Sequence, residues 1–223
     1  TLCGGRAVYE ACVKLRQDLD SRPWQPGEER RAEYYYACDP CFAIGDFEGA
    51  KKRGAKYRNF PAYAYATQAV IVEVDRETGE VRLLKVIAAH DVGRAINPHI
   101  IEGQMHGSCS MGQGYALTEG YPTENGYPVK TLYRQLGLPR AEDTPDYEII
   151  LIEDPEPQGP FGAKGISEVA TVPVTPAILN AVSRAIGVRI NKVPASPEVV
   201  LEAIRTGKCD VPTMEQQVKE LEK

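Results

Sequence analysis

The strongest constraint on the fold is a pair of alternating segments in the first half of the chain. Residues 62–74 read AYAYATQAVIVEV and residues 81–89 read VRLLKVIAA, joined by the short connection DRETG. Apolar and polar residues that alternate with a period of two predict strands, and a short connection containing glycine predicts a hairpin between them. Residues 147–153 (YEIILIE) predict a further strand. The chain is therefore expected to contain an antiparallel hairpin and at least one more strand.

Helices are predicted from their start and stop signals. A capping side chain followed by proline marks three starts, at Asn97-Pro98, Thr175-Pro176 and Ser196-Pro197. The second helix is expected to end at Gly187. Further expectations are a helix at 6–19, an aromatic strand at 33–38, a long loop at 39–59 and a short polar helix from Thr213. These signals predict an α+β domain over 1–206 in which an antiparallel sheet packs with several helices, and a polar, helical C-terminal tail over 207–223.

Composition argues against several classes of partner. The 223 residues include 26 Lys and Arg against 31 Asp and Glu, so the net charge is −5. Without a basic excess, neither nucleic-acid binding nor attachment to an anionic membrane is expected. No run approaches the roughly 18 apolar residues of a membrane helix, and no charged-then-apolar leader is present, so a soluble, cytoplasmic protein is expected. The absence of an initiator Met suggests a piece of a larger polypeptide.

Six cysteines are scattered along the chain, and two of them, Cys38 and Cys41, form a CxxC pair. The spread fits a reducing compartment better than a small disulfide scaffold. No second pair stands at zinc-finger spacing, and the three histidines follow much later. We favour structural thiols or an incidental pair over a metal or redox site, because a single CxxC is a weak signal.

The segment 154–173, DPEPQGPFGAKGISEVATVP, is the strongest candidate for a functional loop. It gathers glycines and prolines around Lys164 and Glu168, directly before an apolar helix. Exposed backbone amides beside a carboxylate suit an oxygen-rich ligand. A nucleotide phosphate loop needs Gly-Lys-Ser/Thr, whereas Lys164 is followed by Gly165, so that reading is disfavoured. An ordinary strand-to-helix turn is the alternative.

The helix predicted after Pro98 carries four glycines, Gly103, Gly107, Gly112 and Gly114. Each costs about 0.5–1 kcal/mol relative to alanine inside a helix. The helix is therefore expected either to break near Gly112 or to let another backbone or a flat ligand approach its glycine face, which we favour. Simple packing against another helix is the alternative.

Three motifs in a fixed order resemble one enzyme family. DRETGEVRLLKVIAAHDVGRAINP, EGQMHGSCSMGQGYALTEG and PEPQGPFGAKGISEVATVPVTPAILNAVSRAIGVRINKVPASPEVVLEAI resemble the C-terminal part of the molybdopterin-binding subunit of the xanthine oxidase family of molybdenum hydroxylases, which includes xanthine dehydrogenases, aldehyde oxidoreductases and nicotinate dehydrogenases. The resemblance runs from about Leu2 to Ile204.

The resemblance implies a molybdopterin cofactor, expected in its cytosine dinucleotide form, with no protein ligand to the molybdenum. By similarity, Glu168 is the catalytic general base, and water is the source of the oxygen added to an aldehyde or an N-heterocycle. A carboxylate in an apolar, partly dry loop would also have its pKa raised toward the working range of a base. Gln104 is expected to hydrogen-bond the cofactor, because an amide offers both donor and acceptor. The other expected cofactor-binding residues are Gly103, Gly107, Gly112, Gln113, Ala163, Lys164, Gly165, Ile166 and Ser167.

The chain departs from the family pattern at two positions. Many relatives have Gln-Gly where this chain has Met111-Gly112, so a polar contact could be taken over by Gln113, and many have glycine where Ser167 precedes the glutamate. The resemblance also places a [2Fe-2S] centre and FAD on partner domains or subunits, and further cofactor contacts on the remaining molybdopterin-binding segment. The alternative is a structural or assembly domain that docks to a partner without catalysis.

Overall fold

The computed structural model describes residues 1–208, and their contacts divide them into two compact units. Unit 1 comprises residues 1–65, 90–98 and 151–166. Unit 2 comprises residues 66–89, 99–150 and, among the described residues, 167–208. The short polar helix expected from Thr213 lies outside the described residues, as does Cys209.

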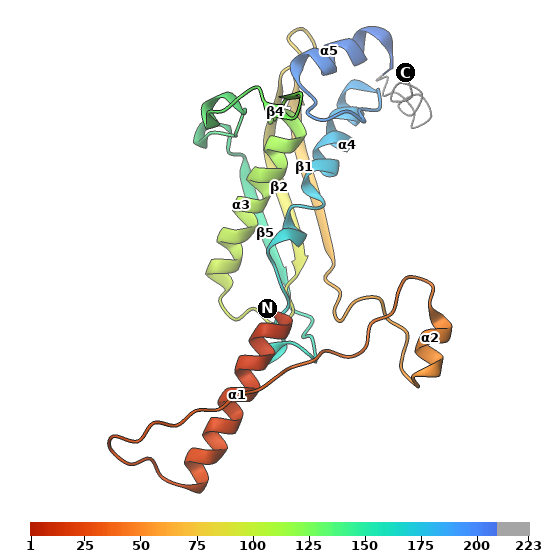
Figure 1. The fold of residues 1–223 in the computed structure, drawn as a ribbon. Coiled ribbons are helices and arrows are strands. Elements are labelled where there is room, and N and C mark those ends of the chain that lie inside the picture. Colours follow the sequence, from red (N-terminus) through yellow and green to blue (C-terminus); the bar gives the residue numbers. More distant parts are fainter. Residues whose placement is uncertain (209–223) are drawn as a thin grey trace. The chain divides into compact units, whose positions relative to one another are not determined.

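Helices and strands follow one another in groups along the chain, in an α+β arrangement (Figure 1). The α-helices are α1 (Leu2–Ser21), α2 (Phe47–Lys52), α3 (Pro98–Leu117), α4 (Val174–Ile186) and α5 (Pro197–Thr206). The strands are β1 (Ala66–Val74), β2 (Val81–Asp91), β3 (Thr123–Glu124), β4 (Tyr127–Pro128) and β5 (Asp146–Ile152). Short 3₁₀ turns are η1 (Tyr133–Gln135), η2 (Ala141–Asp143), η3 (Pro160–Gly162) and η4 (Glu168–Ala170).

The predicted hairpin supplies two strands of a three-stranded sheet with the order β1-β2-β5, in which β2 is central. Its turn is closed by the Asp75 side chain, which accepts hydrogen bonds from the backbone amides of Glu77 (2.7 Å) and Thr78 (3.1 Å). Gly79 follows with φ +79°, a left-handed conformation that glycine adopts without strain. Every second residue of β1 is exposed, so the alternation read from the sequence is the alternation of the sheet's two faces.

In unit 2, helices α3 and α4 pack beside this sheet (Figure 1). Helix α4 contacts β1, and its buried side chains repeat every fourth residue, at Val174, Ile178, Val182 and Ile186. The segment Glu168–Ile186 is long and apolar enough to cross a membrane on length and composition alone, contrary to the expectation that no such run exists. The buried residues of α4 form one stripe, and the helix contacts β1. A single segment of this kind is weak evidence for a membrane span.

Unit 1 holds the long helix α1, the short helix α2 and extended connections. None of the α1 side chains is buried in the described chain. One end of the helix contacts η3, where the Tyr9 and Phe161 rings meet edge to face with centroids 5.0 Å apart. The core of this unit is small, with Phe42, Ala50 and Val92 among its buried apolar residues.

Two local predictions were wrong. Residues 33–38 are not a strand, because these tyrosines have no partner strand in the described chain; instead the Tyr36 hydroxyl donates to the Gln158 side chain at 3.2 Å. The expected loop at 39–59 contains α2, which begins where the Asp46 carboxylate accepts from the Gly49 amide at 2.8 Å. A capping aspartate is enough to start a short helix in a glycine-rich segment.

Candidate active site

One face of α3 offers backbone without side-chain cover. Gly103, Gln104 and Gly107 are all exposed. A Cβ atom added at Gly103 or Gly107 would have no described atom within 4 Å. The Gln104 amide therefore stands beside a strip of bare helix backbone. A flat, polar ligand could approach this strip closely and bond the amide as donor or acceptor.

In the second half of α3 the glycines, Gly112 and Gly114, are buried. The helix continues through them without a break. A Cβ atom at Gly112 would overlap the Val174 side chain of α4, and the Gly112 carbonyl accepts from the Thr175 hydroxyl at 2.8 Å. At this position, packing against a helix accounts for the glycine.

Gln113 is also buried, and its side-chain amide donates to the Asp143 carbonyl at 2.9 Å. Nine residues separate Gln113 from Gln104, which is about two and a half helical turns, so the two side chains leave α3 on opposite sides. A contact from Gln113 to a ligand bound by Gln104 would require the ligand to reach around the helix.

Glu168 begins the short turn η4, and its side chain is exposed in the described chain. The apolar, dry surroundings expected for a base are therefore not supplied by residues 1–208. The backbone on either side is held by unit 2. The Ser108 hydroxyl of α3 donates to the Ser167 carbonyl at 3.3 Å, and the Gln68 side chain of β1 donates to the Ala170 carbonyl at 2.9 Å.

Thus the structure joins the helix that carries Gln104 to the residue directly before Glu168. Sequence reasoning missed both Ser108 and Gln68. Ser108 stands one helical turn after Gln104, and Gln68 occupies an inward-facing position of an alternating strand. A polar residue at an inward position needs a partner, so this signal was present in the sequence.

The remaining predicted residues, 163–166, lie in unit 1, where the segment 162–164 pairs with the HDVGR motif at 90–94. Gly93 and Ala163 form an antiparallel bridge, and the Arg94 amide donates to the Gly162 carbonyl at 2.8 Å. A Cβ atom at Gly93, where φ is +64°, would overlap this carbonyl oxygen. Glycine is therefore needed at position 93 for the two motifs to meet.

Lys164 makes a buried ion pair with Asp91, also in unit 1. Its Nζ lies 2.6 Å from Asp91 Oδ2, and the two side chains are only 7% and 6% exposed. Asp91 Oδ1 accepts from the Gly93 amide at 3.0 Å. Burial lowers the pKa of Lys164, but the hydrogen bond to Asp91 and the charges of Asp91 and Asp154 outweigh it and raise the pKa. The Lys164 side chain is thus paired with a residue of this same chain. Gly165 is exposed, and a Cβ atom added there would contact no described neighbouring group.

The CxxC pair lies in unit 1 beside a third thiol. Burial raises the pKa of Cys38, and the neighbouring Cys3 and Cys41 thiols raise it further. Cys41 donates to the Asp39 carbonyl at 3.6 Å. Within residues 1–208, no three His, Cys, Asp or Glu side chains are grouped so that they could hold a metal ion.

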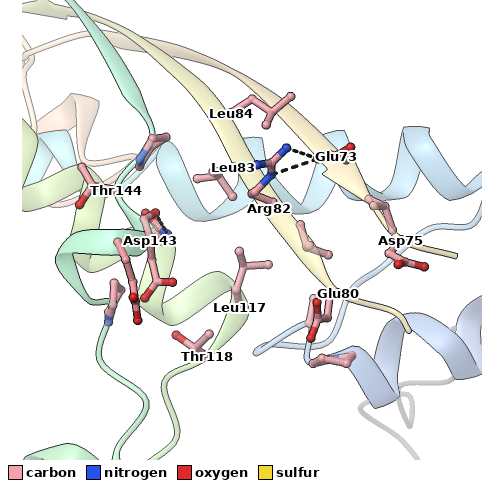
Figure 2. A pocket seen from close by; sticks show the side chains of 18 of the residues that line it. Glu73, Asp75, Glu80, Arg82, Leu83, Leu84, Leu117, Thr118, Asp143 and Thr144 are labelled. Carbon is pink, nitrogen blue, oxygen red and sulfur yellow. Dashed lines mark hydrogen bonds and ion pairs between the residues drawn. The ribbon is translucent and has the colours of Figure 1, made fainter. Parts of the chain in front are cut away.

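A cavity of about 930 Å³ opens in unit 2 around the C-terminal end of α3 (Figure 2). Its wall is rich in carboxylates. In this wall, Arg82 of β2 forms an ion pair with Glu73 of β1. Acidic lining residues are Glu73, Asp75, Glu80, Glu142, Asp143 and Asp146. Gln113 contributes to this wall, but neither Gln104 nor Glu168 does. The candidate base and the candidate cofactor-binding amide therefore do not line this cavity.

Comparison with known proteins places these features in a family. The family model described as the molybdopterin cofactor-binding domain matches residues 1–145 of this chain. These residues include the hairpin, the HDVGRAINP motif and the helix that carries Gln104. The chain belongs to this family. This match confirms the resemblance to the molybdenum-binding subunits of xanthine dehydrogenases and aldehyde oxidoreductases.

Relatives extend the match beyond the family model. The chain is 39% identical over 142 residues to a probable xanthine dehydrogenase subunit of Bacillus subtilis strain 168, covering 64% of this chain and 19% of that protein. It is 30% identical over 210 aligned positions to the aldehyde oxidoreductase molybdenum-binding subunit PaoC of Escherichia coli O157:H7, covering 88% of this chain and 29% of PaoC. An alignment over that share of the chain includes the Glu168 segment.

The solved structure of quinoline 2-oxidoreductase from Pseudomonas putida 86 shows the same fold, with a TM-score of 0.60 and 33% sequence identity. The match covers 64% of this chain and 19% of that one. The α+β fold expected from the sequence is thus confirmed. This molybdopterin cofactor-binding domain spans between a fifth and a third of the length of these relatives.

Proposed function

We propose that this domain is the part of a molybdenum hydroxylase that supplies the general base, Glu168, and holds molybdopterin along α3 through Gln104. The observation that carries the proposal is the hydrogen bond from Ser108 to the Ser167 carbonyl. It ties the residue before Glu168 to the helix that presents Gln104, so both candidate residues belong to one unit.

The residues on α3 fit such a group. Gly103 and Gly107 leave space that any larger side chain would fill, and the exposed Gln104 amide lies between them. The amide can bond the edge of a pterin ring as donor and acceptor. When bound, molybdopterin supplies the redox chemistry at molybdenum, and the protein supplies orientation and proton transfer.

The proposed reaction hydroxylates an aldehyde or an N-heterocycle. A substrate C–H and one water give the hydroxylated product, two protons and two electrons. Glu168 takes up a proton from the water that provides the oxygen, as a positioned general base. The two electrons leave through a [2Fe-2S] centre and FAD, which we place on partner domains or subunits.

The rest of the enzyme is also proposed from the relatives. The Escherichia coli relative is named a molybdenum-binding subunit and the Bacillus subtilis relative is also named as one subunit of an enzyme, which supports a complex of several chains. The cofactor is proposed to be the cytosine dinucleotide form of molybdopterin, and the location to be the cytoplasm. The remaining molybdopterin-binding segment would enclose Glu168, which is exposed in the described chain.

Glu168→Gln in the complete enzyme tests the assignment. Glutamine keeps the size of the side chain but cannot act as a base, and general-base catalysis contributes about 10²- to 10⁴-fold to a rate. We expect turnover to fall by at least about 10²-fold, with molybdenum content unchanged. Glu124→Gln, at an exposed carboxylate in β3, is the matched control and should keep wild-type turnover.

Retained turnover in Glu168→Gln would remove Glu168 from the mechanism. Full molybdenum content without turnover in the wild-type complex, across aldehydes, purines and nicotinate, would instead favour a structural or assembly domain.

A further inference from the structure

We propose that Gln68 and Ser108 are positioning residues that fix the Glu168 turn from both sides. This inference rests on the proposed function, in which Glu168 is the base. Ser108 bonds the carbonyl of residue 167, and Gln68 bonds the carbonyl of residue 170. The two acceptors bracket the three-residue turn η4.

The turn has little hydrogen bonding of its own. The Thr171 amide donates to the Glu168 carbonyl at 3.0 Å, which closes one 3₁₀ turn. Such short turns have poor hydrogen-bond geometry and do not define their own position. The side-chain donors from β1 and α3 therefore decide where the backbone of Glu168 lies within unit 2.

Both donors come from rigid elements. Ser108 is 4% exposed on a helix of 20 residues, and Gln68 faces inward on a strand of nine. The Gln68 amide nitrogen also lies 3.8 Å from the Cys109 sulfur, next to Ser108 on α3. Strand, helix and turn are thus linked at one point. Catalytic groups held by such elements are placed more accurately than groups on free loops.

Removal of one donor should affect placement more than stability. One hydrogen bond makes a small net contribution to folding where the acceptor left behind can bond water, as the carbonyl of the exposed Ser167 can. Ala170 is fully buried, so loss of the Gln68 donor leaves its carbonyl without this bond and also lowers the free energy of unfolding. A displacement of about 1 Å at a reacting group, however, can reduce a rate by about 10²-fold. The signature of a positioning residue is therefore a loss of kcat while the cofactor and KM are retained.

The test uses Ser108→Ala and Gln68→Met in the complete enzyme. We expect kcat to fall by about 10- to 100-fold in both variants, with KM and molybdenum content close to wild type. Tm should stay close to wild type in Ser108→Ala and fall in Gln68→Met, which leaves the buried Ala170 carbonyl unpaired. Hydrogen exchange at the Thr171 amide should become faster in both variants, because the turn is held less firmly. This readout does not depend on turnover. Ser110→Ala, two residues further along α3, and Thr67→Val, an exposed neighbour of Gln68, are the matched controls.

The outcomes separate the two proposals. If Glu168→Gln abolishes turnover while Ser108→Ala and Gln68→Met keep wild-type kcat and wild-type Thr171 exchange, the positioning role is wrong and the base remains. If Glu168→Gln leaves turnover intact, the proposed function fails, whatever the two variants do. Loss of molybdenum content and Tm in both variants would mean that these bonds hold the fold, which also contradicts the inference.

Discussion

The glycines of α3 belong to two groups that a substitution can separate. Gly103 and Gly107 face open space, whereas Gly112 is filled by Val174 of α4. A glycine in either group destabilises the helix relative to alanine. The surroundings of the two groups differ, and so does the reason that each position suits glycine. The open pair leaves room for a ligand, and the buried glycine leaves room for a neighbouring helix.

Gly107→Ala should therefore raise the free energy of unfolding by about 0.5–1 kcal/mol, because alanine favours the helix and meets no described atom. If molybdopterin lies against this face, the same substitution should lower the molybdenum content of the complete enzyme. Thermal unfolding and elemental analysis of the same preparation measure the two effects.

Gly112→Ala is the matched control, with the opposite expectation for stability. Overpacking against Val174 should cost about 1–3 kcal/mol. Wild-type molybdenum content in Gly107→Ala and in a bulkier Gly107→Leu would show that the cofactor does not approach this face.

At the level of single residues, the sequence motifs predicted which residues are candidates for the site. They did not predict how exposed or buried those side chains are. Glu168 and Gln104 were named from the sequence, and both remain proposals. The exposure of Glu168 and the inward direction of Gln113 could not be read from it, because they depend on which elements cover each side chain. Ser108 and Gln68 were missed since their acceptors are backbone carbonyls more than 50 positions away in the chain.

At the level of elements, the contact between HDVGR and GPFGAKG combines backbone hydrogen bonds with one buried ion pair. Asp91 and Lys164 neutralise each other where water has little access. The removal of Asp91 leaves the buried Lys164 charge with only the exposed Asp154 carboxylate, 3.6 Å from its Nζ. A buried charge that loses its partner costs about 3–5 kcal/mol, which is the upper bound here. Asp91→Asn should therefore strongly lower the free energy of unfolding, measured by denaturant titration of the complete enzyme.

The double variant Asp91→Asn with Lys164→Met should recover much of that loss, because no unpaired charge remains. Glu148→Gln, which breaks the more exposed pair with Lys85, is the control and should cost at most about 1 kcal/mol. If Asp91→Asn costs no more than this control, the buried pair does not stabilise the meeting of the two motifs.

Element boundaries were predictable where backbone chemistry fixes them. Helix α3 begins at Pro98, and α5 begins at Pro197, as the proline signals predict, while α4 ends at Gly187 with φ +79°. The start of α4 lies two residues before its predicted position, at Val174, since a proline fits anywhere in a helix's first turn. Ser196 bonds the Glu198 side chain instead of capping the backbone.

At the level of the whole molecule, the chain corresponds to only part of the length of its relatives. It spans 19% of one curated relative and 29% of another. The described residues leave Glu168, Gln104 and Gly107 exposed. The proposed function therefore requires another segment or subunit to cover these residues and to exclude water around the base.

The most direct test of the account is the molybdenum and pterin content of the intact complex that contains this chain. Elemental analysis counts the metal, and fluorescence of the oxidised pterin identifies the cofactor. We predict about one molybdenum and one pterin per copy of the chain, as expected if one molybdopterin site serves each general base. A freshly isolated, intact complex without either would contradict the account and leave Glu168 as a surface carboxylate with no cofactor to serve.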